Sequence, residues 1–222
     1  MSSYPICLLN KVIFPLFGDA YKSMPAYLPF SDFDELLYEE RTSGTQEDLQ
    51  NAIEVYLLSK NTTWGISAYP EKRASLDGYS RIRGEEFQRP YHIGLDIAAP
   101  AGTMLYAPLN GEVVVSEYES GSGNYGGLLG LKHIVDGCVF YSIYGHMNAD
   151  TLLPIGTNVA AGDAIGALGT MEQNGGWWHH VHLQVLTERG FNDGWVHRAL
   201  ATKEEIERLN DLCPNPLFLL RF

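Results

Sequence analysis

Short apolar runs separated by glycine-rich turns occupy the middle of the chain, between about residues 90 and 190. The runs are rich in Val, Ile, Leu and Tyr, and each has the length of one β-strand. Asp136-Gly137 lies between two of them and predicts a tight β-hairpin. Closely spaced strands of this kind predict an antiparallel sandwich or barrel-like core. The runs are Glu112–Tyr118, Leu128–Val135, Val139–Tyr144, Ala164–Leu168 and Val181–Leu186.

The chain on either side of this region has helical patterns. Apolar residues recur at helical spacing over Glu47–Lys60 and predict an amphipathic helix. The sequence Ser31–Asp34 resembles a helix N-terminus and predicts a short helix through Tyr38. Thr202–Glu205 has the pattern of a capping box, which predicts a helix that ends before Cys213.

These patterns predict a mainly β protein with three parts. Residues 86–200 are expected to form a small antiparallel sheet or barrel-sandwich-like core. Residues 1–85 are expected to form a helical or irregular N-terminal extension. Residues 201–222 form a short C-terminal helix and tail.

Three histidines crowd together at the start of the last apolar run of the core. In a strand, side chains alternate between the two faces, so His180, His182 and Gln184 share one face. The residues between them are apolar and are suited to the core. Two imidazoles on one face can reach a common metal ion.

Two other segments carry polar groups in similar positions. His92 and Asp96 lie on the same side of an extended segment, and Gly94 leaves space between them. The run that ends at His146 places this histidine together with Ser142 and Tyr144, by the same alternation.

These residues suit a catalytic zinc ion, which takes three protein ligands and keeps one position for water. His92, Asp96 and His182 supply two nitrogens and one oxygen. The metal lowers the pKa of its water toward roughly 7 and polarises the scissile carbonyl. His146 and His180 remain to move the proton of the water to the leaving amine. We therefore expect one Zn²⁺ per chain.

Charge and cysteine usage narrow the possible partners. The chain of 222 residues has a formal net charge of −12, which argues against nucleic acid or an anionic membrane as a main partner. The three cysteines are far apart, which predicts neither a thiolate metal site nor a disulfide framework. The apolar stretch Pro5–Phe17 contains Lys11 and is shorter than the roughly 20 residues of a membrane span. Without a recognisable secretion signal we expect a cytoplasmic location, unless a signal preceding Met1 was removed.

The motifs together resemble the lysostaphin-type (LytM-like) zinc metallopeptidases, which are peptidoglycan endopeptidases. The resemblance implies that His92, Asp96 and His182 bind zinc and that His146 and His180 are the catalytic or transition-state-stabilising pair. It also implies hydrolysis of peptide bonds in cross-bridges or stem peptides, within a groove lined by loops. Helical N-terminal extensions in the family can cover that groove, a role that the resemblance offers for residues 1–85. The matching segments include His92-Ile-Gly-Leu-Asp96, Tyr106-Ala-Pro108, Tyr144-Gly-His146, Gly162-Asp-Ala-Ile-Gly166 and His180-Val-His182.

The lead-in to His180 departs from the short glycine-rich segment typical of this family, because it contains Trp177 and Trp178. A tryptophan here either narrows the groove, stacks on substrate or packs in a core. We retain Trp178 and Tyr144 as candidate substrate-binding residues.

Three other functions are alternatives to a zinc endopeptidase. Gly156–Gly169 resembles a biotinyl or lipoyl carrier motif, but a carrier needs an exposed lysine at a hairpin tip and Lys132 lies in mid-strand. A latent, peptidase-like binding domain is disfavoured because all five functional positions are present. The third alternative is an intracellular metallo-hydrolase of another peptide or amide. The flanks Tyr69–Arg73 and Cys213–Pro216 favour it, since they resemble a metallopeptidase-like module of large intracellular proteins.

Overall fold

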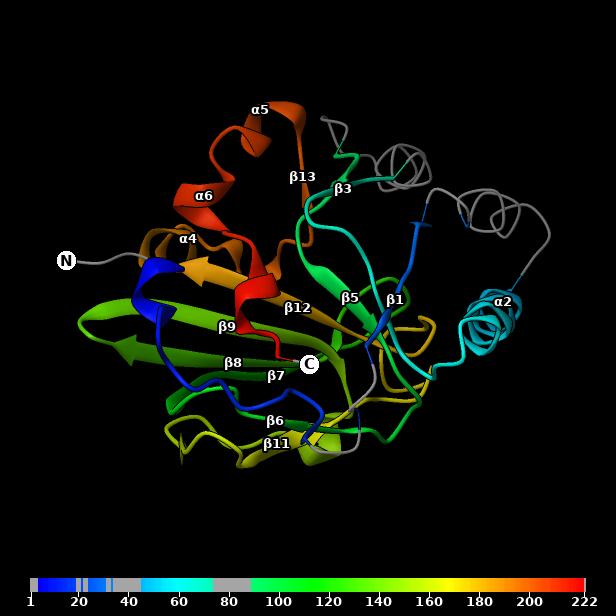
Figure 1. Ribbon diagram of the computed structural model, residues 1–222, viewed down its shortest axis with the longest axis horizontal. Helices are drawn as coiled ribbons and strands as arrows, with labels where there is room; N and C mark the ends of the chain where they lie inside the picture. Colours follow the sequence, from blue (N-terminus) through cyan, green and yellow to red (C-terminus); the bar gives the residue numbers. More distant parts are fainter. Residues whose placement is uncertain are drawn as a thin grey trace.

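A computed structural model describes residues 4–18, 21, 24–30, 33, 45–73 and 89–221. The main unit of this part of the chain is an eight-stranded sheet in the order β1-β2-β5-β12-β9-β8-β7-β10 (Figure 1). Neighbouring strands are antiparallel except for the parallel pair β1 and β2. The strands are β1 (Ala26–Tyr27), β2 (Gly65–Ile66), β5 (Leu95–Ala98), β12 (His180–Thr187), β9 (Cys138–Met147), β8 (Gly126–Val135), β7 (Gly111–Glu119) and β10 (Asn158–Val159).

Two smaller sheets complete the β structure of the described residues. β6 (Met104–Tyr106) pairs with β11 (Ala164–Ala167) and lies beside the large sheet (Figure 1). β4 (Tyr91–His92) lies between β3 (Glu71–Lys72) and β13 (Leu200–Ala201). The predicted mainly β, antiparallel core is thus confirmed.

The β8–β9 hairpin shows why the local sequence forms this structure. Asp136 and Gly137 have φ angles of 49° and 79°, the left-handed values that a two-residue type I′ turn requires. Val135 pairs with Cys138 directly across the turn. The hairpin predicted from Asp136-Gly137 is confirmed.

The two faces of the sheet bury different apolar clusters. One face packs against the smaller β6–β11 sheet, with Leu105 and Ile165 in the same cluster as Leu183. The other face is covered by the C-terminal helices, α4 (Glu188–Asn192) and α6 (Leu209–Leu212) among them (Figure 1).

The predicted C-terminal helix begins at its Thr202 capping box but is divided into two short helices. These are α5 (Lys203–Ile206) and α6, separated at Arg208, whose φ of −109° and ψ of 5° are not helical. Short 3-10 turns η1 (Ile6–Leu8), η3 (Ala149–Thr151), η4 (Trp195–His197) and η5 (Pro216–Leu219) lie in the connections.

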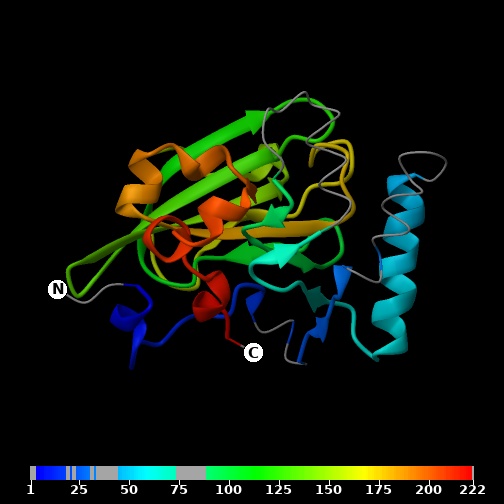
Figure 2. The same ribbon diagram turned by 90° about the horizontal axis from the view of Figure 1, so that it is seen from above.

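The N-terminal amphipathic helix is confirmed as α2 (Gln46–Ser59), which stands beyond one edge of the sheet (Figure 2). Thr45 caps it in a reciprocal capping box with Asp48, and its apolar face joins a cluster that includes Phe30 and Trp178. The short helix predicted through Tyr38 lies outside the described residues. No helix of the described chain has the length and apolar character needed to cross a membrane.

The N-terminal part also contributes strands to the core. β1 and β2 extend the large sheet next to β5, and β3 pairs with β4. The predicted boundary at residue 85 stays a prediction, but the strands on both sides of it share hydrogen-bonded sheets.

Candidate metal centre

Four strands bring the predicted functional side chains together. His92 ends β4, Asp96 lies in β5, and His182 lies in β12 opposite Asp96. β9 supplies His146, one residue after the Gly145 that pairs with His182. The sheet register therefore assembles residues that are as much as 90 positions apart in the chain.

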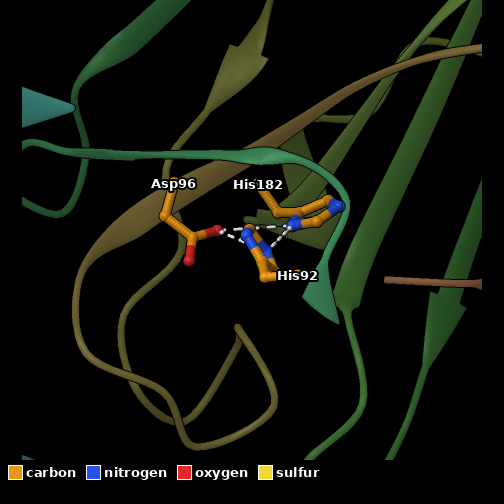
Figure 3. A group of neighbouring side chains, drawn as sticks. All are labelled: His92, Asp96 and His182. Atoms are coloured by element: carbon orange, nitrogen blue, oxygen red, sulfur yellow. Dashed lines mark hydrogen bonds and ion pairs between the residues drawn. The ribbon is translucent and has the colours of Figure 1, made fainter. Parts of the chain in front are cut away.

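Three potential ligand atoms form a small triangle (Figure 3). The Nε2 atom of His92 lies 2.9 Å from Nδ1 of His182 and 3.2 Å from Oδ1 of Asp96, and the last two atoms are 3.3 Å apart. Ligands about 2.0–2.2 Å from a tetrahedral zinc ion are separated by about 3.3–3.6 Å. The triangle is tighter than this by up to 0.4 Å, at its 2.9 Å side. Its two-nitrogen, one-oxygen composition suits zinc.

Gly94 allows this close approach. A Cβ atom at this position would lie 2.3 Å from Cε1 and 2.5 Å from Nε2 of His182. Any side chain at Gly94 would therefore displace the imidazole. The expected space between His92 and Asp96 exists, and the ring of His182 fills it.

His180 lies beside this triangle. Its Nε2 is 3.6 Å from Oδ1 of Asp96, and its Nδ1 is 2.8 Å from the carbonyl oxygen of Trp178. A carbonyl only accepts hydrogen bonds, so Nδ1 carries the hydrogen and Nε2 presents its lone pair. Burial lowers the pKa of His180 to about 4, so the ring is neutral at pH 7.

His146 is held in the same way, with Nδ1 2.9 Å from the carbonyl oxygen of Asn174. Its ring centroid lies 4.4 Å from that of His180. Burial, followed by the neighbouring His180 and His182, holds the pKa of His146 well below its usual value. Two neutral imidazoles, each with a free Nε2, therefore lie next to each other at the triangle.

The alternation predicted for β9 is wrong at its end. His146 has a φ of 65°, and this left-handed residue turns its side chain toward His180. Tyr144 pairs with Leu183 and lies in the opposite, apolar cluster with no exposed surface. The structure thus places Tyr144 in the core, away from the histidines, and gives it no surface for the substrate contact that we expected.

Trp178 is also a packing residue in this structure. It is 3% exposed, and its ring stacks on His180 at a centroid distance of 3.9 Å and an interplanar angle of 19°. Its backbone N–H donates to Gln46 of α2. The expected contact between Trp178 and substrate has no open surface here, and the ring instead supports His180.

Arg73 also contacts this centre, and it was not predicted from the sequence. Its Nη2 lies 2.8 Å from Oδ2 of Asp96 and 3.2 Å from Nδ1 of His92, while Nε lies 2.7 Å from Glu71. Its guanidinium also lies 3.9 Å from the ring centroid of Phe30. Glu71 pairs with His92 across β3 and β4. This pairing brings Arg73 to the site. The sequence singled out the flank Tyr69–Arg73 but gave no sign that it reaches the histidines.

The side chains around Asp96 keep it ionised. Burial alone would raise its pKa, but His92, then Arg73 and His180, hold this pKa well below the usual range. Burial and then Arg73 lower the pKa of His92 to about 3. Asp96 is therefore a carboxylate and His92 is neutral at pH 7, the states in which they bind a metal ion.

All five predicted residues are buried. Their exposed fractions lie between 1% and 7%: His182 1%, Asp96 2%, His92 4%, His180 4% and His146 7%. The centre is therefore closed off from solvent in this structure.

A family model supplies the deciding comparison. Residues 90–193 match the model described as Peptidase family M23. This segment, just under half of the chain, is similar to peptidase family M23. The match includes all five site residues and confirms the resemblance to lysostaphin-type metallopeptidases. The M23 segment also contains every strand of the core from β4 to β12.

Several solved structures are similar to this chain. A zinc-containing peptidase from Vibrio cholerae is 28% identical, with a TM-score of 0.36, and the match covers 44% of this chain and 28% of that one. Csd3 from Helicobacter pylori is 22% identical over 61% of this chain and 28% of its own, with a TM-score of 0.38. The catalytic domain of lysostaphin from Staphylococcus simulans is 21% identical, with a TM-score of 0.40. That match covers 55% of this chain and 82% of the lysostaphin domain. The chain thus spans less than a third of the first two proteins, and no curated protein sequence matches it.

Proposed function

We propose that this protein is a zinc-dependent endopeptidase that hydrolyses peptide bonds in peptidoglycan cross-bridges or stem peptides. The observation that carries the proposal is the triangle of His92 Nε2, Asp96 Oδ1 and His182 Nδ1, with two neutral histidines beside it. These three residues would hold one zinc ion, and the M23 match supports a peptidase reaction at such a centre.

The zinc ion, when bound, supplies a water molecule of lowered pKa and polarises the scissile carbonyl. His146 and His180 do the remaining work, because each has a free Nε2 that can accept a proton. Their low pKa values keep them in the basic form over the neutral pH range. After accepting a proton, either ring can donate it to the leaving amine or stabilise negative charge on the oxygen of the tetrahedral intermediate.

Arg73 sets one condition on metal binding. A guanidinium only donates hydrogen bonds, so its contact with His92 Nδ1 requires a lone pair there and a hydrogen on Nε2. If His92 were to hold zinc through Nε2, its hydrogen would have to be on Nδ1. Arg73 would then keep only its contact with Oδ2 of Asp96, which is already the shorter one at 2.8 Å.

Digestion of purified peptidoglycan tests the proposal. The wild type is expected to release peptides cut at cross-bridges or stems, detected by mass spectrometry of the digest. The His146→Ala variant should retain zinc but lose roughly 10²–10⁴-fold in rate, because it lacks one proton-transfer group. His182→Ala should lose both zinc and activity.

His197→Ala is the matched control, because His197 is a half-exposed histidine that pairs with Glu117 and Glu119 on the surface. This variant should digest peptidoglycan at the wild-type rate. Zinc binding without cleavage would contradict the proposed substrate and favour the intracellular hydrolase or the latent binding domain. Equal activity of wild type and His146→Ala would contradict the proposed chemistry.

A further inference from the structure

Gln184 follows His182 by two residues on β12 and shares its face of the sheet. The side chain of Gln184 has no exposed surface. Its Oε1 lies 3.1 Å from Nε2 of His182, on the side of the ring opposite the proposed metal ligand atom Nδ1. The family comparison assigns no role to this residue.

A second hydrogen bond orients the amide of Gln184. Its Nε2 lies 3.4 Å from the carbonyl oxygen of the buried Trp195, in the turn η4. A carbonyl oxygen cannot donate, so the NH₂ group of the amide must face Trp195. The amide oxygen consequently faces His182.

This orientation determines the tautomer of His182. The amide oxygen only accepts, so Nε2 of His182 carries the hydrogen and donates it. In a neutral ring Nδ1 then has the lone pair. Nδ1 is the atom that lies 2.9 Å from His92 Nε2 and 3.3 Å from Asp96 Oδ1.

The other tautomer would compete with the metal ion. With its hydrogen on Nδ1, His182 would donate to Oδ1 of Asp96 across 3.3 Å. That hydrogen bond would occupy the centre of the ligand triangle. It would also leave Nε2 of His182 and Oε1 of Gln184 as two buried acceptors facing each other, which is costly.

We propose that Gln184 is a positioning residue that holds His182 in the tautomer with a free Nδ1 and thereby increases the affinity of the site for zinc. The inference rests on the proposed role of His182 as a zinc ligand. Hydrogen bonds from the second ring nitrogen of a ligand histidine commonly change metal affinity 10–100-fold, about the effect expected here.

The test compares Gln184→Met and Gln184→Glu with the wild type. Methionine has a similar size but neither accepts from His182 nor donates to Trp195. Zinc affinity, measured by competition with a chromophoric chelator, should fall about 10–100-fold in Gln184→Met. Gln184→Glu should bind zinc at least as tightly as the wild type, because a carboxylate accepts the same hydrogen more strongly.

Ser142→Ala is the matched control. Ser142 is a buried partner of His133, with a 2.7 Å bond between Oγ and Nε2, in the neighbouring strands β8 and β9. Its loss removes a buried hydrogen bond to a histidine outside the centre. Zinc affinity should stay at the wild-type value.

Ring nitrogen NMR on chelator-treated protein gives a readout independent of zinc. Wild type and Gln184→Glu should show His182 with its hydrogen on Nε2, whereas Gln184→Met should show an increased share of the Nδ1–H form. An unchanged tautomer and an unchanged zinc affinity in Gln184→Met would overturn the inference. If Gln184→Met does not fold, Gln184→Glu tests the inference instead. A tenfold loss of zinc affinity in Gln184→Glu would overturn the inference. A wild type that binds no zinc but has the Nε2–H tautomer would instead contradict the proposed function and leave the orienting role of Gln184 standing.

Discussion

At the scale of single residues, the proposed zinc centre depends on close contacts that leave little space for substitution. His182 packs against the bare backbone of Gly94, and Arg73 places a buried cation on Asp96. The space at Gly94 can be predicted from the His-x-Gly-x-Asp spacing. The contact between Arg73 and Asp96 cannot, because Glu71 and Arg73 reach the site through strand pairing between β3 and β4.

Gly94→Ala is expected to weaken zinc binding without unfolding the protein. The added Cβ would meet the imidazole of His182 at 2.3 Å, while the backbone at Gly94 is not in the left-handed region. Loss of a residue that only hydrogen-bonds a metal ligand lowers affinity about 10–100-fold. Displacement of the ligand His182 itself should lower zinc affinity by at least as much. Elemental analysis and thermal unfolding measure the two effects.

Gly137→Ala is the control for this substitution. Gly137 has a φ of 79° in the distant hairpin and no atom within 4 Å of an added Cβ. This variant should lose about 1 kcal/mol of stability through backbone strain and keep its zinc. A zinc loss as large as that of Gly94→Ala would contradict the steric explanation.

Arg73→Met should destabilise the fold by about 3–5 kcal/mol in the presence of a chelator. It leaves the buried carboxylates of Glu71 and Asp96 without their cation, and removal of one partner from a buried ion pair has this cost. Lys11→Met is the comparison, because the Lys11–Asp136 pair is exposed and should contribute less than about 1 kcal/mol. Urea unfolding measures both, and equal losses would show that Arg73 is not a buried counter-ion.

At the scale of elements, the strand pattern predicted most of the site and failed where the backbone left the regular conformation. Alternation along β12 placed His180, His182 and Gln184 on one face, and hydrogen bonds confirm this for the last two. On β9 the same rule grouped Tyr144 with His146. The positive φ of His146 reverses its side chain, and sequence alone gives no signal for a left-handed histidine.

The β8–β9 pair also contains His133, which should make stability depend on pH. Its ring is buried between Asn110 and Ser142, and burial lowers its pKa to about 4. Because this folded value lies below the unfolded value of 6.5, the stabilising contribution is present above pH 6.5 and is lost as the pH falls toward 4. The shift corresponds to roughly 3 kcal/mol.

Urea unfolding of wild type and His133→Gln at pH 7 and pH 4 measures this contribution. The wild type should lose roughly 3 kcal/mol more between the two pH values than the variant, in which residue 133 cannot titrate. Carboxylates and the histidines of the centre change equally in both proteins. The same pH dependence in both would show that His133 does not resist protonation in the folded state.

At the scale of the whole molecule, the N-terminal part is structurally continuous with the M23 segment. β1 and β2 extend the sheet from β5, and Arg73 reaches Asp96. Gln46 and Gln50 of α2 accept hydrogen bonds from the backbone of Trp178 and His179, just before the ligand strand. The family resemblance suggested an extension near the groove, but these contacts depend on the three-dimensional arrangement of elements.

The zinc content of the purified protein tests the central claim most directly. Elemental analysis of wild type and His182→Ala, both prepared without chelator, is the measurement. We expect about one zinc per chain in the wild type and a strongly reduced content in the variant, because the variant retains only two of the three ligands. A wild type without metal, or a variant with undiminished zinc, would contradict a zinc centre formed by His92, Asp96 and His182.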